Sequence, residues 1–248
     1  MKLTYNDITI DFFERGDPNQ VLLSLSGGLD SAALFYLICK HFSNTTIIPY
    51  TAKDILAPFD SECAGDITDF MQEIFPHVNI LDREVFEFDR NAPLALQIAK
   101  EKMEEEKVIV NGKNIPRATL KGLSKILLKR QGEKKLKEKY PNAIVTTGQS
   151  LNPPVEVMKE MGFYELAERR RDLDENSKRI WGITYQPFIN VDKKFIADIY
   201  KKENLIDSLF PLTNSCIGHA KVTDFFTKEC RNCFWCYEKK WAFDLKWL

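Results

Sequence analysis

The chain has 248 residues, of which 44% are apolar, and its 35 basic and 36 acidic residues leave a net charge of −1. This length can bury the core of one α/β domain with a small appendage, and the near-zero charge excludes a general attraction to nucleic acid or an anionic membrane. No run approaches ~18 consecutive apolar residues, and the first residues lack a signal-peptide core and a cleavage pattern. We therefore expect a cytoplasmic protein without a membrane partner.

The first half of the chain alternates expected strands and helices. Residues 3–13 alternate in polarity and predict a strand or hairpin, and the continuous apolar run 21–26 is typical of a strand buried in a parallel sheet. The pattern then predicts a helix over 31–42, a strand over 45–52, a helix over 61–75 that Ser61 caps, and a strand over 78–86.

The second half continues this alternation and then weakens. We expect a charged helix over 93–107, a tight turn within 108–116, a long helix over 118–140 and a strand over 143–148. A loop at 152–154 follows, then a charged helix over 155–172, and finally a loop from 182 in which Asp192 caps a further helix. The alternation predicts an α/β fold with a doubly wound parallel sheet.

A glycine turn lies between the apolar strand and the apolar helix of residues 21–38. Its glycines let the backbone turn sharply, while the N–H groups and dipole of the following helix point at whatever the turn binds. Ser26 and Ser31 add hydroxyl donors, and Asp30 suits a magnesium ion carried by a nucleotide. The pattern predicts a phosphate site, with an ordinary strand-to-helix turn as the alternative.

Four of the six cysteines form a cluster in sequence, C-x13-C-x2-C-x2-C, at Cys216, Cys230, Cys233 and Cys236. Four thiolates suffice for a structural tetrahedral Zn²⁺ site, and nearby basic residues would offset its charge: Lys228, Arg231, Lys239 and Lys240. His219 could replace one ligand, and an iron–sulfur cluster or free or paired cysteines are the alternatives. Cys39 and Cys63 are interpreted as small packed residues.

Basic residues concentrate in two segments. Residues 117–139 hold nine of them against two acidic residues, and Arg169, Arg170 and Arg171 follow one another in the next expected helix. The simplest interpretation of both is a solvated helix face, and a surface for RNA or nucleotide phosphate is the alternative.

The complete run Ser26-Gly27-Gly28-Leu29-Asp30-Ser31 resembles the SGGxDS signature of the PP-loop, or N-type, ATP pyrophosphatases. It lacks the lysine of a Walker A loop. The resemblance implies an adenine nucleotide alpha hydrolase-like, Rossmann-like fold, in which the loop holds the pyrophosphate end of ATP while a substrate oxygen attacks the α-phosphate. It implies Mg²⁺ beside ATP, Asp30 and Ser31 as catalytic residues, and a nucleotide site of Leu25, Ser26, Gly27, Gly28, Leu29, Asp30, Ser31, Thr51, Ala52 and Gly148.

Together with the cysteine tail, this loop is similar to the 7-cyano-7-deazaguanine synthase family. In that family a cysteine, a short loop and a CGxCxxC stretch end the chain, and TNSC at 213–216 with CRNCFWCYEKKWAF at 230–243 follows this outline. Pro116-Arg117 and TTGQS at 146–150 also match. The family's aspartate-tyrosine-glycine element after the second strand is absent, because residues 50–54 read YTAKD.

This resemblance implies an enzyme that converts a carboxylate on a 7-deazaguanine to an amide and then a nitrile, using free ammonia and adenylating an oxygen each time. AMP with pyrophosphate, or ADP with phosphate, would be released. We expect a PP-loop domain at 1–205 and a zinc-binding segment at 206–248. Lys53 and Arg117 are candidate phosphate or carboxylate contacts. The implied partner is a 7-carboxy-7-deazaguanine-like small molecule. Nucleic acid is not favoured, and a homodimer is left open.

Two alternatives remain at this point. One is an ATP-dependent tRNA-modifying thiolase or ligase of the same superfamily, which the basic segments favour and which bound iron rather than zinc would indicate. The other is a nucleotide-binding subunit without turnover, against which the intact loop with Asp30 argues.

Overall fold

The computed structural model describes residues 1–14, 16–54, 59–88, 93, 96–97, 100–101, 107–110, 113–116, 120–163, 180–181, 184–216 and 229–246. Within them a six-stranded sheet runs in the order β5-β4-β3-β8-β10-β9. Its strands are β3 (Gln20–Ser24), β4 (Thr46–Asp54), β5 (Glu84–Phe88), β8 (Ile144–Thr147), β10 (Thr184–Tyr185) and β9 (Ile180–Trp181). The first five are parallel and β9 is antiparallel to β10. This confirms the predicted α/β class with a parallel sheet.

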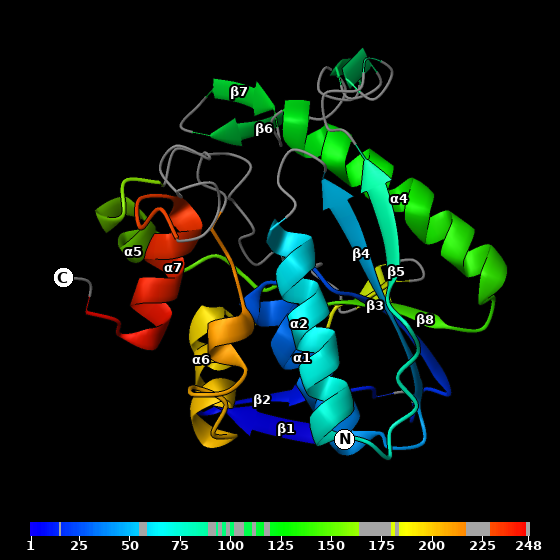
Figure 1. The fold of residues 1–248 in the computed structure, drawn as a ribbon. Helices are drawn as coiled ribbons and strands as arrows, with labels where there is room; N and C mark the ends of the chain where they lie inside the picture. Colours follow the sequence, from blue (N-terminus) through cyan, green and yellow to red (C-terminus); the bar gives the residue numbers. More distant parts are fainter. Residues whose placement is uncertain are drawn as a thin grey trace.

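Helices cover both faces of this sheet. The structure holds α1 (Leu29–His41), α2 (Phe59–Ile74), α4 (Leu120–Lys139), α5 (Val155–Glu160), α6 (Lys193–Lys202), η2 (Phe210–Leu212) and α7 (Phe234–Phe243). Figure 1 shows α4 on the opposite side of the strands from α6 and α7. Successive side chains of β3 point to opposite faces of the sheet. Leu23 packs in the core beside α1, and Leu22 packs in the core beside α4. The sheet is therefore doubly wound.

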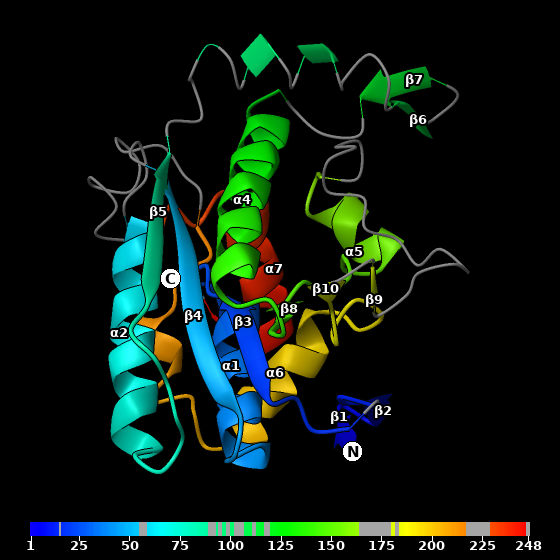
Figure 2. The same ribbon diagram turned by 90° about the vertical axis from the view of Figure 1, so that its right-hand side faces the viewer.

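The order of the strands places a switch point beside β3. From β3 the chain moves through β4 to β5 on one side, and later returns to add β8 and β10 on the other. In open α/β sheets, ligands bind beyond the carboxyl ends of the strands at such a reversal. Figure 2 shows β3 with β4 and β8 on its two sides.

Two hairpins accompany the sheet. Strands β1 (Lys2–Tyr5) and β2 (Ile8–Asp11) pair antiparallel around Asn6 and Asp7, whose φ angles of 47° and 57° are those of a tight hairpin turn. This confirms the hairpin expected over 3–13. Strands β6 (Lys107–Val110) and β7 (Lys113–Pro116) form the second hairpin.

Several expected boundaries were wrong. Helix α2 begins at Phe59, so Ser61 is not its cap but lies in the first turn, where its hydroxyl accepts a hydrogen bond from Arg83 Nη1 at 3.1 Å. The strand expected over 78–86 is a single bridge between Ile80 and Ile47, followed by β5. The expected loop from residue 182 contains β10.

Two expected helices end early or lie largely outside the described residues. The helix expected over 155–172 ends as α5 at Glu160, and Gly162 follows with a φ of 75°, a left-handed conformation that terminates helices. The part beyond residue 163 lies outside the described residues. The helix expected over 93–107 cannot include Lys107, which begins β6, and most of its other residues also lie outside them. Asp192 is confirmed as a cap, because its carboxylate accepts from Lys194 N at 2.9 Å.

No helix in the described part of the chain is long and apolar enough to cross a bilayer.

Candidate nucleotide site and cysteine cluster

The glycine turn lies between β3 and α1, at the carboxyl end of the central strand. Its first residue is fixed by the neighbouring strand, since Leu25 N donates to the Tyr50 carbonyl at 2.8 Å and the Thr51 hydroxyl donates to the Leu25 carbonyl at 2.8 Å. Thr51 is buried. The structure therefore places Thr51 beside the turn, and the hydroxyl of Thr51 supports its backbone, whereas Ala52 pairs with Phe86 of β5.

Two glycines allow close approaches that a side chain would prevent. Gly27 has a φ of 75°, and a Cβ there would lie 2.2 Å from the Asp60 carbonyl oxygen at the start of α2. At Gly148, after β8, a Cβ would lie 2.5 Å from the Asp30 carbonyl oxygen. Gly28 is different, because a Cβ there would meet nothing closer than 3.5 Å. Gly27 and Gly148 thus let α2 and β8 pack directly against the turn.

The start of α1 is the candidate anion site. Gly28 is the N-cap residue, and no side chain of the described residues caps the helix there. The first N–H groups of a helix have no partner inside the helix, and its dipole is positive at this end. The hydroxyls of Ser26 and Ser31 lie 3.2 Å apart beside these amides, and Ser31 Oγ donates to the Gly28 carbonyl at 3.0 Å. Amides and hydroxyls are the kinds of group that bind phosphate at helix N-termini.

Asp30 carries the turn's negative charge and lies in a partly buried polar network. Its Oδ1 accepts from Lys193 Nζ at 2.6 Å, and its Oδ2 accepts from the Ser150 hydroxyl at 2.8 Å. Lys193, the first residue of α6, is 5% exposed. The position of Asp30 is therefore set by α6 and by the segment after β8.

A second carboxylate contacts the same ammonium group. Glu238 Oε2 on α7 lies 3.7 Å from Lys193 Nζ, and Glu238 is 1% exposed. A buried carboxylate, Glu238, and a half-buried one, Asp30, thus share one ammonium, which links helix α7 to the glycine turn. Buried charges are tolerated only when they are paired in this way. Tyr200 of α6 adds a neutral contact, because its buried hydroxyl donates to the Leu29 carbonyl at 3.1 Å.

Sequence reasoning missed Lys193, Ser150 and Glu238. One feature of the sequence could have identified Lys193. It follows the cap residue Asp192 at the start of a helix with an apolar face, and a lysine on such a helix needs a charged partner if it is buried. Ser150 belongs to the TTGQS run but was not singled out. Glu238 lies among lysines and aromatic residues, and nothing in its local pattern distinguishes it from a surface residue.

The other candidate contacts are paired with other groups or lie outside the described residues. Lys53 Nζ pairs with Glu87 Oε1 at 2.7 Å at the sheet edge. Arg117, the three arginines at 169–171 and His219 are outside the described residues. Within α4, Lys129 pairs with Glu133 at 3.6 Å, and Lys137 donates to two backbone carbonyls. These described lysines fit the solvated-face interpretation of the basic helix.

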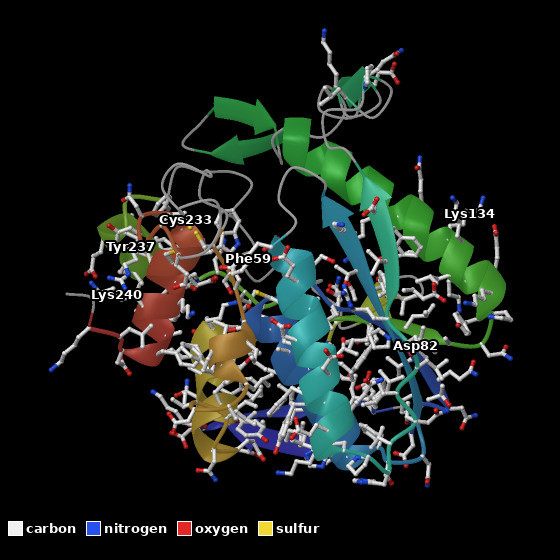
Figure 3. The ribbon with its side chains drawn as sticks, viewed as in Figure 1. Phe59, Asp82, Lys134, Cys233, Tyr237 and Lys240 are labelled. Carbon is white, nitrogen blue, oxygen red and sulfur yellow. The ribbon has the colours of Figure 1, made fainter. Side chains whose placement is uncertain are left out.

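The four cysteines of the predicted metal site come together. All four Sγ atoms lie within 4.8 Å of one another, and those of Cys230 and Cys236 are 3.9 Å apart. Cys233 is the N-cap of α7 and Cys236 lies in its first turn. In Figure 3, Cys233 and Phe59, the first residue of α2, lie toward the same end of the molecule.

The cluster suits a single metal ion. With Zn–S bonds of about 2.3 Å, tetrahedral geometry places sulfur atoms about 3.8 Å apart. Each cysteine of a [4Fe-4S] cluster binds a different iron, which spreads the sulfurs more widely. Two backbone N–H groups donate to the sulfurs, Cys230 N to Cys216 Sγ at 3.2 Å and Asn232 N to Cys230 Sγ at 3.4 Å, and such bonds favour thiolates. The donor set therefore fits one zinc ion.

The other two cysteines, Cys39 and Cys63, are buried. Burial raises the pKa of the Cys39 thiol. Burial, followed by the charge of Asp60, raises that of Cys63 to about 12. Reactive cysteines have lowered pKa values and some exposure. Both residues are therefore packed side chains, as expected from the sequence.

Asn214 joins the cysteine cluster to the phosphate turn. Its backbone N donates to the Gly27 carbonyl at 2.8 Å. Its side-chain Nδ2 donates to Asp60 Oδ1 at 3.1 Å and to the Cys216 carbonyl at 3.2 Å, while Oδ1 accepts from Cys216 N at 3.1 Å. One residue thus contacts the turn, the start of α2 and the first cysteine.

Comparisons with known proteins add only distant structural likenesses. No family model matches the chain, and no curated protein sequence does. Among solved structures, the U34-tRNA thiolase NcsA from Methanococcus maripaludis with its [4Fe-4S] cluster has a TM-score of 0.47 at 10% identity over 92% of this chain, which spans 65% of the thiolase.

Two synthetases are similar at the same level. An NH3-dependent NAD synthetase from Campylobacter jejuni has a TM-score of 0.42 at 15% identity, over 80% of this chain and 69% of its own. An NMN synthetase from Francisella tularensis has a TM-score of 0.44 at 14% identity, over 95% and 90%.

The sheet and the site together define the class of protein. It is a Rossmann-like α/β protein with a glycine turn at its switch point, the candidate phosphate site, and a four-cysteine cluster that fits a metal ion beside that turn.

Proposed function

We propose that this protein is an ATP pyrophosphatase of the PP-loop type, which binds ATP in the turn from Leu25 to Ser31. An oxygen of the organic substrate attacks the α-phosphorus of ATP. The bond between that phosphorus and the bridging oxygen breaks, and pyrophosphate leaves. The observation that carries this proposal is the SGGxDS turn itself, whose uncapped helix start and paired serine hydroxyls lie at the switch point of the sheet.

The residues around the turn suit this chemistry, which needs alignment and charge neutralisation more than covalent catalysis. The amides of α1 and the hydroxyls of Ser26 and Ser31 would bind phosphate oxygens. Lys193 brings a buried positive charge next to Asp30. Asp30 is the residue that would hold Mg²⁺, because each carboxylate oxygen keeps a lone pair after one hydrogen bond, and the ion would neutralise phosphate charge.

The proposed substrate is the carboxylate of a 7-deazaguanine. The carboxylate oxygen takes AMP, and ammonia then attacks the carbonyl carbon, so that AMP leaves and an amide forms. In a second round the amide oxygen takes AMP, and loss of AMP and protons leaves a nitrile. The support for this substrate is the combination of the turn with a cysteine-rich tail, a pair of features that the sequence shares with the 7-cyano-7-deazaguanine synthase family.

The four cysteines would hold one structural Zn²⁺. Four thiolates leave no open coordination position, so the ion would fix the chain and take no part in the chemistry. Bound to all four, the ion would join Cys216 to the three cysteines that follow, and so would restrain the segment with Asn214. Lys239, one of the expected charge partners, pairs with Glu229 at 2.7 Å beside the cluster.

The experiment is incubation of the purified protein with 7-carboxy-7-deazaguanine, ammonium and MgATP, with products read by mass spectrometry. We expect the amide or nitrile and one pyrophosphate for each adenylation. Asp30→Ala should lose turnover, whereas Asp207→Ala, at an exposed aspartate after α6, should keep it. Equal pyrophosphate release from the wild type and Asp30→Ala would contradict the proposal. Bound iron, with sulfur transfer to tRNA, would favour the tRNA-modifying alternative.

A further inference from the structure

The phosphate turn and the cysteine cluster are connected through one short segment. Asn214 lies two residues before Cys216, and its side chain makes both of its contacts with the Cys216 backbone across this interval. On the other side it contacts Gly27 and Asp60, which border the turn. Asn214 is 6% exposed. Any displacement of the Cys216 backbone must therefore pass to these contacts.

We propose that Asn214 is a positioning residue through which the metal ion of the cysteine cluster sets the affinity of the turn for nucleotide. This inference rests on the proposed binding of ATP in the turn. The metal would hold Cys216 in place, Cys216 would hold the Asn214 side chain, and Asn214 would fix the Gly27 carbonyl and the start of α2. The amides that follow Gly27 would then already point at the phosphates.

The geometry explains why a small displacement would matter. Gly27 is in the left-handed conformation and lies so close to Asp60 that even a Cβ would not fit between them. Asn214 bonds to both of these residues, so it spans the closest contact of the turn. If the side-chain bonds of Asn214 are lost, the turn gains freedom that nucleotide binding must then remove.

Helix α7 also leads from the cysteine cluster toward the turn, but other anchors hold it in place without the metal. Cys233 and Cys236 lie at its start, and Glu238 one turn further contacts Lys193, which contacts Asp30. The far end of α7 is held by apolar packing, because the Phe243 ring lies 4.7 Å from that of Phe210 and 5.7 Å from that of Tyr200. Helix α7 thus has anchors besides the metal, and we expect the metal-stripped protein to remain folded.

Coupling between two sites is reciprocal. If the metal raises nucleotide affinity through Asn214, nucleotide must raise metal affinity by the same factor. We expect this factor to be about tenfold, within the usual range for coupled sites. A purely structural role for Asn214 would lower stability but would not make the two affinities depend on each other.

The test is calorimetry with the non-hydrolysable analogue α,β-methylene-ATP and Mg²⁺, on zinc-loaded and metal-stripped protein, with far-UV circular dichroism as the check of folding. We expect about tenfold weaker binding after stripping. Asn214→Ala should bind the analogue about tenfold more weakly when zinc-loaded, with no further loss after stripping. The matched control is Asn232→Ala, because exposed Asn232 contacts Cys230 only through its backbone N–H among the described contacts, and it should behave as the wild type.

The reciprocal measurement uses a chromophoric zinc chelator as competitor. The analogue should tighten zinc binding about tenfold in the wild type and Asn232→Ala, and leave it unchanged in Asn214→Ala. This measurement starts from loaded protein, so it also decides the matter if the stripped protein unfolds. Equal zinc affinity with and without the analogue in the wild type would overturn the coupling. No binding of the analogue to loaded wild type would instead overturn the proposed function.

Discussion

Asp30 and Lys193 lie 163 positions apart in the chain and form an ion pair of 2.6 Å beside the glycine turn between β3 and α1. Asp30 is in the first turn of α1, and Lys193 is the first residue of α6. The pair brings the starts of two helices together at the carboxyl ends of the strands. Because Glu238 also contacts Lys193, the ammonium neutralises charge from two elements at once.

Lys193→Met should destabilise the protein and weaken nucleotide binding. The substitution leaves the half-buried carboxylate of Asp30 and the buried carboxylate of Glu238 without their shared ammonium, and removing one partner of a buried pair costs about 3–5 kcal/mol. Denaturant unfolding measures the free energy, and calorimetry with α,β-methylene-ATP measures the affinity. The control is Lys194→Met, which removes a half-buried cation from the face of Trp241 and should cost under about 1 kcal/mol. Equal losses in the two variants would contradict the special position of Lys193.

Gly148→Ala should also be destabilising, although the change adds only one methyl group. That methyl would lie 2.5 Å from the Asp30 carbonyl oxygen and 2.8 Å from Ser31 N, so β8 and α1 must move apart. Such overpacking costs about 1–3 kcal/mol, and the shift falls on the amides of the turn. Gly28→Ala is the comparison, since its nearest neighbour would be 3.5 Å away. Denaturant unfolding should give a lower free energy of unfolding for Gly148→Ala than for Gly28→Ala. A free energy of unfolding equal to that of the wild type would contradict this prediction, because it would show that the backbone moves aside at no cost.

The sequence predicted those parts of the fold and site that depend on neighbours in the chain. The strand-turn-helix unit around Gly27 is local, since its apolar runs, glycines and hydroxyls follow one another, and it was found. The spacing of Cys230, Cys233 and Cys236 is local as well, and the structure brings these cysteines together with Cys216.

The missed parts depend on contacts between distant segments. Ser150 and Lys193 reach Asp30 across 120 and 163 positions, and only the folded sheet brings them together. Strand β10 has only two residues, too few to show the alternation of polar and apolar residues that predicts a strand. It forms because β8 offers an edge with which it can pair. Ser61 was a plausible cap by residue type, but its hydroxyl is bonded to Arg83 instead.

Metal content provides a prediction that is independent of the substrate. We expect one zinc per chain by elemental analysis, with loss of the metal in Cys236→Ser and retention in Cys39→Ser, since Cys39 is buried in the main core away from the cluster. Loss of the metal removes a cross-link between Cys216 and α7, which should lower the free energy of unfolding by about 2 kcal/mol or more. Iron in place of zinc, or equal zinc content in both variants, would contradict this assignment.

Glu203 should make the free energy of unfolding depend on pH in the acidic range. Burial alone would raise the pKa of Glu203, but hydrogen bonds from Lys40, Tyr5 and Tyr36 outweigh it and hold the pKa below its ordinary value of 4.5. A carboxylate with a lowered folded-state pKa stabilises the protein above its unfolded-state pKa, and this contribution is lost as the pH falls through the folded-state pKa. Glu203→Gln should therefore be less stable than the wild type by about 2 kcal/mol at pH 7, and the difference should shrink below about pH 4.5.

Urea unfolding at several pH values measures this difference in the free energy of unfolding, with Glu160→Gln, a substitution at an exposed residue of α5, as the control. A difference that stays constant from pH 7 to pH 3 would show that Glu203 does not owe its contribution to its charge.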